Sequence, residues 1–205
     1  PKKKSEYGVF TTKEILRLIK DGRTVSVPFP EAISFKEEVL PLDPYTLGFL
    51  IGDGCFRGQG SISFTTLDKE VVEYIKDGVK DLNLRIAQQP DTITYYIRMA
   101  ERFNQKNDKG QYVVENDAVR IIKEFGLENH TSYDKFIPVQ YKRGTLEDRL
   151  SLVQGLMDSD GCVDETGRLL EFSTSSQQLA LDMQEVIWSL GGKAKIVSRI
   201  PTYTH

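Results

Sequence analysis

A short acidic motif occurs twice in this chain, and this repeat constrains the fold more than any other feature. Gly52-Asp53-Gly54-Cys55 recurs as Ser159-Asp160-Gly161-Cys162, with the two aspartates 107 residues apart. Further matches follow one residue out of step: Phe64-Thr65-Thr66 with Phe172-Ser173-Thr174, and Leu82–Arg85 with Leu190–Lys193. Several matches in the same order over tens of residues are typical of a duplicated structural unit. The chain is therefore predicted to contain two related halves.

The two halves are predicted to have the same order of local elements. Asp43 and Pro44 are typical of a helix N-terminus, and Thr145 with Asp148 forms a capping-box pattern at the matching place. The first half predicts a helix to Ile51, a strand over 61–65, a helix over 69–81, strands from Arg85 and over 92–99, a polar loop over 104–110 and a helix over 116–125. The second half predicts a helix to Met157, a strand over 169–174, a helix over 176–190 and a strand from Lys193.

The first 42 residues precede the repeat. Thr11 and Glu14 predict a capped helix that Asp21-Gly22 ends. Residues 24–27 are predicted as a strand, and Pro28, Pro30 and Pro41 are typical of a linker. The predicted organisation is an accessory segment at 1–42, a first half-domain at 43–140 and a second half-domain at 141–205. The second half-domain is expected to be incomplete at its C-terminus, because it stops within the counterpart of the strand at 92–99.

Composition argues against several other classes of protein. The longest apolar runs are far shorter than the ~18 residues of a membrane span, so no membrane association is expected. Two cysteines and two histidines are too few for a disulfide scaffold or an ordinary zinc site, and the cysteine count is typical of a reducing compartment. The formal net charge of −3 gives no overall basic field. Residues 193–205, however, contain three basic and no acidic side chains, so the distribution of charge is compatible with a nucleic-acid partner.

Each repeated motif closes a predicted helix with an aspartate. Gly48 with Gly52, and Gly155 with Ser159, place small residues four positions apart, which allows two helix backbones to approach closely. A carboxylate at a helix C-terminus opposes the helix dipole and costs some stability. A feature that is present twice against local preference indicates a function.

If the two helices pack side by side, Asp53 and Asp160 meet at their ends. Two neighbouring carboxylates repel unless they share a proton or bind a divalent cation. Hard oxygen ligands that face a phosphodiester suit Mg²⁺, which activates water and stabilises negative charge. The strands after each helix would then build two saddle-like sheets, one for each half-site of a DNA duplex.

These motifs resemble those of the LAGLIDADG homing endonucleases of the single-chain, two-motif type. The resemblance covers residues 43–205, and the first motif departs from the family pattern at Thr46, Leu47 and Ile51, positions that mostly serve helix packing. It implies an α+β fold of two pseudo-twofold αββαββα units, with the motif helices packed at the centre and saddle-shaped antiparallel sheets. It also implies that Asp53 and Asp160 are the metal-binding catalytic acids.

A second sequence motif indicates which members of this family the chain resembles. Residues 133–138, Tyr-Asp-Lys-Phe-Ile-Pro, are similar to the Lys-x-Ile-Pro block of intein-borne endonucleases, where the lysine assists water activation or charge stabilisation. Lys135 is therefore a candidate catalytic residue, and its repeat partner would fall beyond His205. The candidate metal site consists of Asp53, Asp160, Gly52 and Ser159, and it would hold Mg²⁺, Mn²⁺ or, in a non-cleaving complex, Ca²⁺.

Strand alternation predicts the residues that face DNA. Ile62 and Phe64 should face the helices, which leaves their neighbours outward. Arginine and glutamine on such a face can read base edges, while lysine, serine and threonine mostly hold phosphates. The candidates are Arg57, Gln59, Ser61, Ser63, Thr65, Arg85, Gln89, Thr94, Tyr96, Arg98, Arg168, Glu171, Ser173, Lys193, Lys195 and Arg199.

The sequence therefore predicts a metal-dependent, site-specific endonuclease that makes a staggered double-strand cut with 3′ overhangs. Its expected partners are double-stranded DNA with a long target site and, within an intein, the host protein. It is expected to act as a monomer on genomic DNA in the cytoplasm. Two other interpretations stay open: a DNA- or RNA-binding module of this family that no longer cleaves, and an intein fragment whose main activity is protein splicing.

Overall fold

The computed structural model describes residues 8–57, 61–101, 108, 110 and 115–200. The chain divides into two compact units, Pro1–Pro30 and Glu31–His205. The first unit contains helix α1 (Thr12–Lys20), which begins with the predicted capping box of Thr11 and Glu14 and buries none of its residues. The predicted strand at 24–27 is wrong: these residues form no strand, because the described part of this unit offers no second strand with which they could pair.

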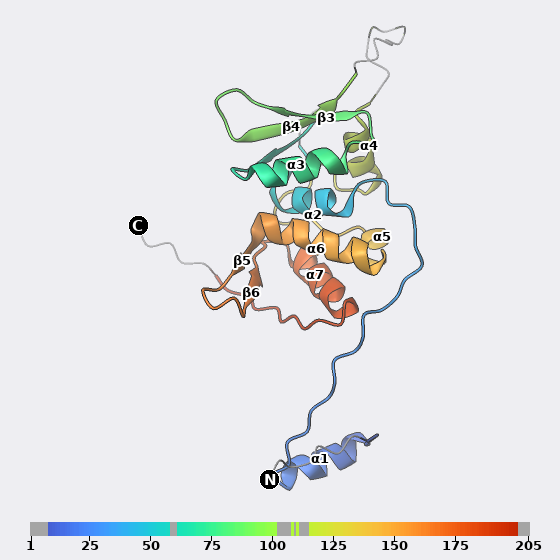
Figure 1. Ribbon diagram of the computed structural model, residues 1–205, viewed down its shortest axis with the longest axis vertical. Helices are drawn as coiled ribbons and strands as arrows, with labels where there is room; N and C mark the ends of the chain where they lie inside the picture. Colours follow the sequence, from blue (N-terminus) through green and yellow to red (C-terminus); the bar gives the residue numbers. More distant parts are fainter. Residues whose placement is uncertain (1–7, 58–60, 102–107, 109, 111–114, 201–205) are drawn as a thin grey trace. The chain divides into compact units, whose positions relative to one another are not determined.

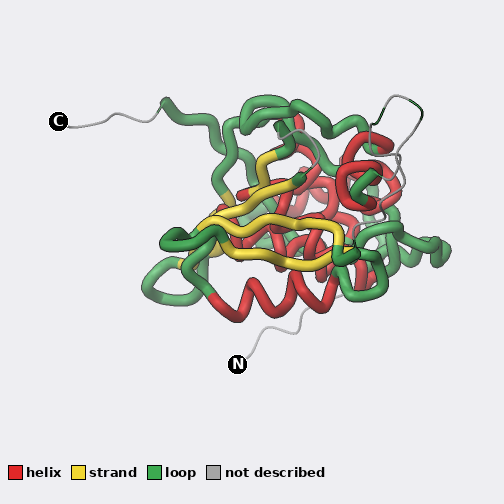
Figure 2. The backbone as a smooth tube through the Cα atoms, turned by 90° about the horizontal axis from the view of Figure 1, so that it is seen from above, coloured by secondary structure: helices red, strands yellow, loops and turns green. Residues whose placement is uncertain are grey.

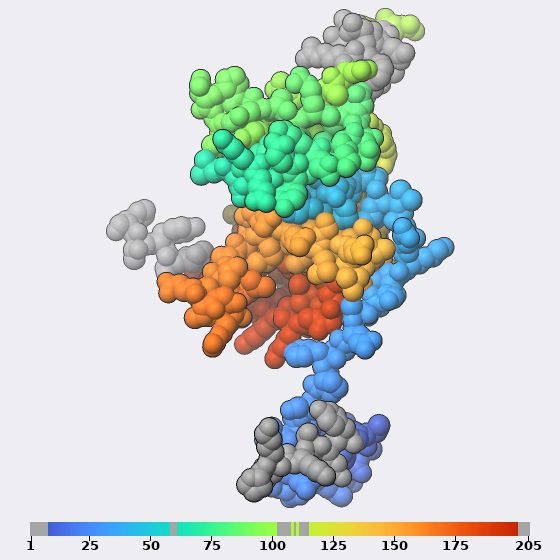
Figure 3. All heavy atoms as spheres, in the orientation of Figure 1, coloured from blue at the N-terminus to red at the C-terminus, as the bar shows by residue number. Residues whose placement is uncertain are grey.

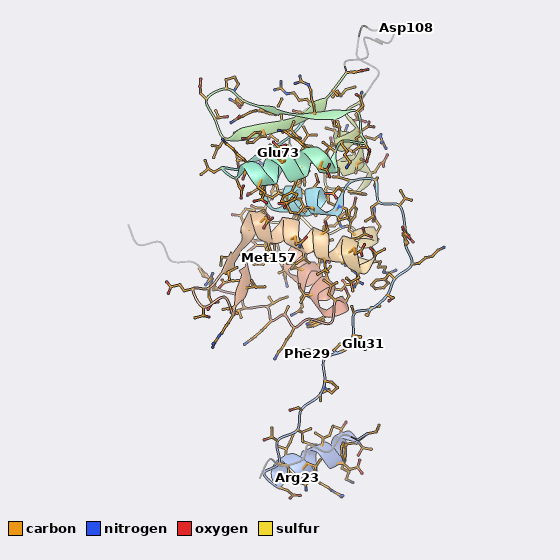
Figure 4. All side chains as sticks on the ribbon, viewed as in Figure 1. Arg23, Phe29, Glu31, Glu73, Asp108 and Met157 are labelled. Atoms are coloured by element: carbon orange, nitrogen blue, oxygen red, sulfur yellow. The ribbon has the colours of Figure 1, made fainter. Side chains whose placement is uncertain are left out.

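Two helices occupy the centre of the second unit. They are α2 (Pro44–Asp53) and α6 (Leu146–Asp160), which lie side by side in Figure 1 and meet across the middle of the space-filling view in Figure 3. The Asp43 side chain accepts a hydrogen bond from Thr46 N at 2.8 Å, and Thr145 with Asp148 forms the predicted capping box. Figure 4 shows the side chains around the pair, with Met157 labelled on α6.

The helix backbones touch where their glycines lie. A Cβ atom added at Gly48 would lie 2.2 Å from the carbonyl oxygen of Leu152, and one added at Gly155 would lie 2.1 Å from that of Tyr45. Distances under 3.0 Å are not compatible with the packing of a real Cβ atom. Any side chain at these positions would therefore push the helices apart.

Four antiparallel strands follow α2 in the chain. They are β1 (Gly54–Cys55), β2 (Ile62–Thr65), β3 (Leu84–Gln88) and β4 (Thr94–Met99), in the spatial order β1-β2-β4-β3. Figure 2 shows this sheet lying across the helices. Ile62 and Phe64 point into the core as predicted, with exposed fractions of 2% and 1%, and the Phe64 ring packs against Phe49 of α2. Helices α3 (Lys69–Gly78) and α4 (Asp117–Glu124) complete this layer.

The chain after α6 contains fewer described strands than the chain after α2. It contains strands β5 (Gly161–Val163) and β6 (Leu170–Phe172), which form a two-stranded sheet, and helix α7 (Gln177–Ser189). The predicted strand from Lys193 is wrong, since residues 191–200 form no strand. Its counterpart β3 pairs only with β4, and the described residues after α7 provide no such partner.

The two helix–strand–strand–helix segments share one ladder register. Gly54 pairs with Phe64 and Cys55 with Ser63, while Gly161 pairs with Phe172 and Cys162 with Glu171. The one-residue change in the sequence offset, from 107 to 108, therefore falls between the paired residues of the two strands.

Residues 31–42 are mostly exposed, but hydrogen bonds hold them to the rest of the second unit at Ile33 and Leu42, the latter through α5 (Val139–Lys142). Ile33 N donates to Ser189 O at 2.8 Å, and the buried guanidinium of Arg149 donates to Ile33 O. Farther along, the hydroxyl of Tyr141 donates to Leu42 O at 2.7 Å. No helix among the described residues is long and apolar enough to cross a membrane.

Candidate functional site

The ends of α2 and α6 bring two aspartates together. Asp53 is the last residue of α2 and Asp160 the last residue of α6. A Cβ atom added at Gly52 would lie 1.9 Å from Ser159 Oγ and 3.1 Å from Asp160 Oδ2. The carboxylate of Asp160 therefore lies directly against the residue that precedes Asp53.

The environment of this pair disfavours its negative charge. Both residues are exposed, but the surrounding protein partly desolvates them. This desolvation, followed by the charge of Asp160, raises the pKa of Asp53 to about 6, although the nearby ammonium of Lys135 opposes the shift. Partial desolvation also raises the pKa of Asp160, and Lys135 again opposes the shift. Neither carboxylate accepts a hydrogen bond or forms an ion pair with any residue in the described ranges. The protein thus holds two neighbouring carboxylates without neutralising them.

Lys135 lies behind this pair and is buried, with an exposed fraction of 5%. Its Nζ donates to the carbonyl oxygens of Gly54 at 2.7 Å, Gly52 at 3.0 Å and Leu50 at 3.4 Å, and it lies 4.9 Å from the centre of the Phe56 ring. Burial lowers its pKa to about 8, and the charges of Asp160 and Asp53 oppose this shift. The side chain therefore contacts the end of α2 itself.

The donor set fits a hard divalent cation held by two carboxylates. No group of three or more His, Cys, Asp or Glu side chains capable of holding a metal occurs among the described residues, so water and substrate oxygens would complete the coordination, as is usual for Mg²⁺. Ser159 Oγ donates to Leu156 O at 2.8 Å and keeps its oxygen lone pairs. The Gly52 carbonyl accepts from an ammonium, which makes it the weakest of the four predicted ligands.

One face of the first sheet carries most of the DNA-contacting residues that were predicted in the first half. Ser63 lies opposite Tyr96, Thr65 opposite Thr94, and Arg85 opposite Arg98. Directly paired residues point to the same face, and Ser61 and Gln89 continue that face by alternation. The other face holds Ile62, Phe64 and Ile97, which are buried. Arg57 is exposed just after β1, and Gln59 lies outside the described residues.

Side chains on this outer face contact one another. The guanidinium of Arg98 lies 4.8 Å from the centre of the Tyr96 ring, and the hydroxyl of Tyr96 donates to Gln89 Oε1 at 3.1 Å. Neither Arg85 nor Arg98 forms an ion pair with a residue that the structure describes. The face therefore presents a polar row with two unneutralised arginines.

The DNA-contacting residues that were predicted in the second half do not share one sheet face. Glu171 accepts from Arg199 Nη2 at 2.7 Å, and Ser173 N donates to the backbone oxygen of Asp160 at 3.1 Å. Arg168 is exposed in the turn before β6. Lys193 and Lys195 are exposed but lie in the irregular segment after α7.

The sequence-based prediction missed the residues that hold Lys135 in place. Ser176 Oγ donates to Lys135 O at 2.6 Å, and Asp182 Oδ2 accepts from Ile137 N at 2.9 Å. Asp182 lies on the apolar face of α7 with Leu179 and Val186 and is 2% exposed. An acid at a core position of an amphipathic helix was the available signal, because a buried carboxylate requires a partner.

Comparison with known proteins identifies the class. Residues 147–204 match a family model described as the LAGLIDADG-like domain. The segment 147–204 therefore belongs to the LAGLIDADG family.

Its relatives include three proteins named replicative DNA helicase DnaB. The protein of Synechocystis sp. is 32% identical over 162 residues, which cover 73% of this chain and 18% of that protein. The protein of Mycobacterium intracellulare is 29% identical, with 81% and 22% covered, and that of Nostoc sp. is 24% identical, with 73% and 17% covered. The chain thus spans about a fifth of the length of these relatives.

Proposed function

We propose that this chain is the endonuclease region of an intein carried by a DnaB-type replicative helicase, and that it cuts both strands of DNA at a specific site. The observation that carries the proposal is the pair of unneutralised carboxylates, Asp53 and Asp160, at the joined ends of α2 and α6. The relatives support the host, because each matches this chain over a minor part of its own length. The block at 133–138 supports an intein origin.

In this proposal Asp53 and Asp160 hold the divalent cation, with Ser159 and Gly52 as further oxygen donors. A bound Mg²⁺ supplies Lewis acidity and lowers the pKa of water. The two carboxylates set the position at which a scissile phosphate can lie, and a divalent cation between them would relieve the repulsion of their negative charges. The expected product is a staggered break with 3′ overhangs.

We further propose that the two helix–strand–strand–helix segments are copies of one half-site unit related by a pseudo-twofold axis. Their shared ladder register supports this relation. The outer face of the first sheet would read one half-site through Arg85, Arg98 and Gln89, since such side chains can bond to base edges in the major groove. The second half would contact the other half-site.

The test is cleavage of a helicase gene that lacks the insertion. The wild-type chain is expected to cut it in Mg²⁺ and to stop when EDTA removes the metal. The double variant Asp53→Asn, Asp160→Asn is expected to lose cleavage by about a thousandfold or more, because neither amide can hold the cation. Asp77→Asn, which removes an exposed carboxylate of α3 that pairs with Lys80, is the control.

Cleavage retained by the double variant would overturn the assignment. Metal-independent binding of the site by wild-type protein without any cutting would favour a module of this family that no longer cleaves.

A further inference from the structure

We propose that Lys135 is a positioning residue: it fastens the carboxyl end of α2, and helix α7 of the second half holds it there. Lys135 thereby links the second half of the molecule to the aspartate of the first motif. The part of this inference that concerns cation binding rests on the proposed function, whereas the part that concerns the end of α2 does not.

The first step is the use of the Lys135 ammonium. An ammonium group has three N–H donors, and Nζ has three carbonyl acceptors, on Gly54, Gly52 and Leu50. The carbonyls at the end of a helix lack partners within it and carry partial negative charge. Lys135 therefore gives Gly52 O, at the end of α2, a partner and adds to the bond that Leu50 O already accepts from Gly54 N. Its donors are engaged before any water or phosphate arrives.

The second step is the place of Asp53 between two of these acceptors. The carbonyls of Gly52 and Gly54 belong to the residues on either side of Asp53, and both accept from the same Nζ at 3.0 and 2.7 Å. Both flanking residues are glycines, which restrict the backbone least. The lysine thus supplies the rigidity that the local sequence lacks and fixes where the Asp53 carboxylate points.

The third step is the anchoring of Lys135 itself. Ser176, the N-cap of α7, is 1% exposed and donates through Oγ to Lys135 O at 2.6 Å. Asp182, farther along the same helix, accepts from Ile137 N at 2.9 Å and pairs with Lys142 Nζ at 2.9 Å. Two buried side chains of α7 therefore hold the backbone on both sides of Phe136.

A role in charge stabilisation and a role in positioning differ in the sign of one effect. Lys135 acts electrostatically on both Asp53 and Asp160. If the ammonium contributed only its charge, its removal would strengthen binding of a cation to the two carboxylates. If it positions Asp53, its removal weakens cation binding although a positive charge has been lost.

The first experiment measures amide hydrogen exchange in the metal-free protein. In Lys135→Met, exchange at Gly54, whose N–H closes the end of α2 on Leu50 O, is expected to be faster by about tenfold. Exchange at Leu47, whose N–H donates to Asp43 O at the start of α2, is expected to stay unchanged. Ser176→Ala, which keeps the ammonium, is expected to produce a smaller change at Gly54 in the same direction and provides the test if Lys135→Met does not fold.

The second experiment titrates each folded variant with Ca²⁺ by calorimetry. Lys135→Met and Ser176→Ala are expected to bind Ca²⁺ more weakly than wild type by about fivefold or more. The exposed control Lys123→Met is expected to leave the affinity unchanged. Unchanged exchange at Gly54 in both variants, or tighter Ca²⁺ binding by Lys135→Met, would overturn the inference. A wild-type protein that binds no Ca²⁺ would instead contradict the proposed function, and the exchange result would still decide the role of Lys135.

Discussion

The segments 54–64 and 161–172 form the same antiparallel ladder, but they bury different amounts of apolar surface. Phe64 and its counterpart Phe172 both pack against the core, whereas two other pairs differ. Ile62 is 2% exposed in β2, whereas Leu170, its counterpart in β6, is 67% exposed. Phe56 is 4% exposed and its counterpart Val163 is 58% exposed. In the first segment, β4 pairs with the outer edge of β2 and brings Ile97 opposite Ile62. No such strand borders β6 in the described residues.

The comparison separates two properties of a strand pair. The register follows from the turn and the alternation, which both segments possess. Burial of Ile62 depends also on β4, which pairs with β2, and no described strand takes that place beside β6. Identical local ladders can therefore contribute very different amounts to stability.

The largest expected difference concerns these two equivalent side chains. Ile62→Ala should lower the free energy of unfolding by about 2–5 kcal/mol, because it leaves a cavity in a packed core. Leu170→Ala should change it by less than about 0.5 kcal/mol, because the side chain already contacts water. Urea denaturation of both variants measures the difference. Similar losses for the two would mean that Leu170 is covered in solution.

Substitutions in the two motif helices, by contrast, should have similar effects on stability. Gly48→Ala and Gly155→Ala should each destabilise the protein by about 1–3 kcal/mol, because each added Cβ would meet the backbone of the other helix. Ser151→Ala on α6 is the control and should not destabilise. Thermal or urea unfolding provides the values. A large loss at one glycine with none at the other would break the equivalence of the helices.

A third prediction concerns the pH dependence of the metal-free protein. The pKa of Asp53 is about 6 in the folded state and 3.8 as the reference value. Between these values the folded protein binds more protons than the unfolded chain, so the free energy of unfolding falls as pH rises from about 4 to about 7. Asp53→Asn should therefore be more stable than wild type at pH 7, and its advantage should vanish near pH 4.

Urea titrations in EDTA at a series of pH values test this sign. Asp160→Asn should shift stability in the same direction, since partial desolvation also raises the pKa of Asp160. A stability difference for Asp53→Asn that did not change with pH would show that the surroundings of the carboxylate do not disfavour its charge.

The smallest effect compares the outer faces of the two sheets. Arg85 and Arg98 lie directly opposite each other, and like charges in such pairs destabilise a sheet. Arg98→Ala should therefore leave stability unchanged or raise it slightly while weakening DNA binding. Arg199→Ala, which removes an exposed ion pair with Glu171, should slightly lower stability.

Fluorescence anisotropy at several salt concentrations measures the DNA affinity of these variants, and urea denaturation measures their stability. Loss of stability in Arg98→Ala without loss of DNA affinity would assign the arginine a structural role.

The sequence alone predicted the parts of the structure that depend on neighbouring residues. The capping boxes at Thr11 and Thr145 and the N-cap at Asp43 lie where expected, because their hydrogen bonds span three residues. The alternation of Ile62 and Phe64 predicted the buried face of β2. Asp53 and Asp160 could be paired in advance because the repeat placed both at the ends of helices whose small residues allow close contact.

Only the tertiary structure decided which groups those residues would meet. A strand from Lys193 matched its counterpart in sequence, yet it does not form without a partner strand. The motif around Lys135 predicted a lysine near the site, but its bonds to carbonyls of Leu50, Gly52 and Gly54, and its support from α7, join segments more than 40 residues apart. Short-range hydrogen bonds and side-chain alternation depend on residues that are close in the sequence. Ladder partners and buried polar contacts depend on distant segments and form only when these segments pack together.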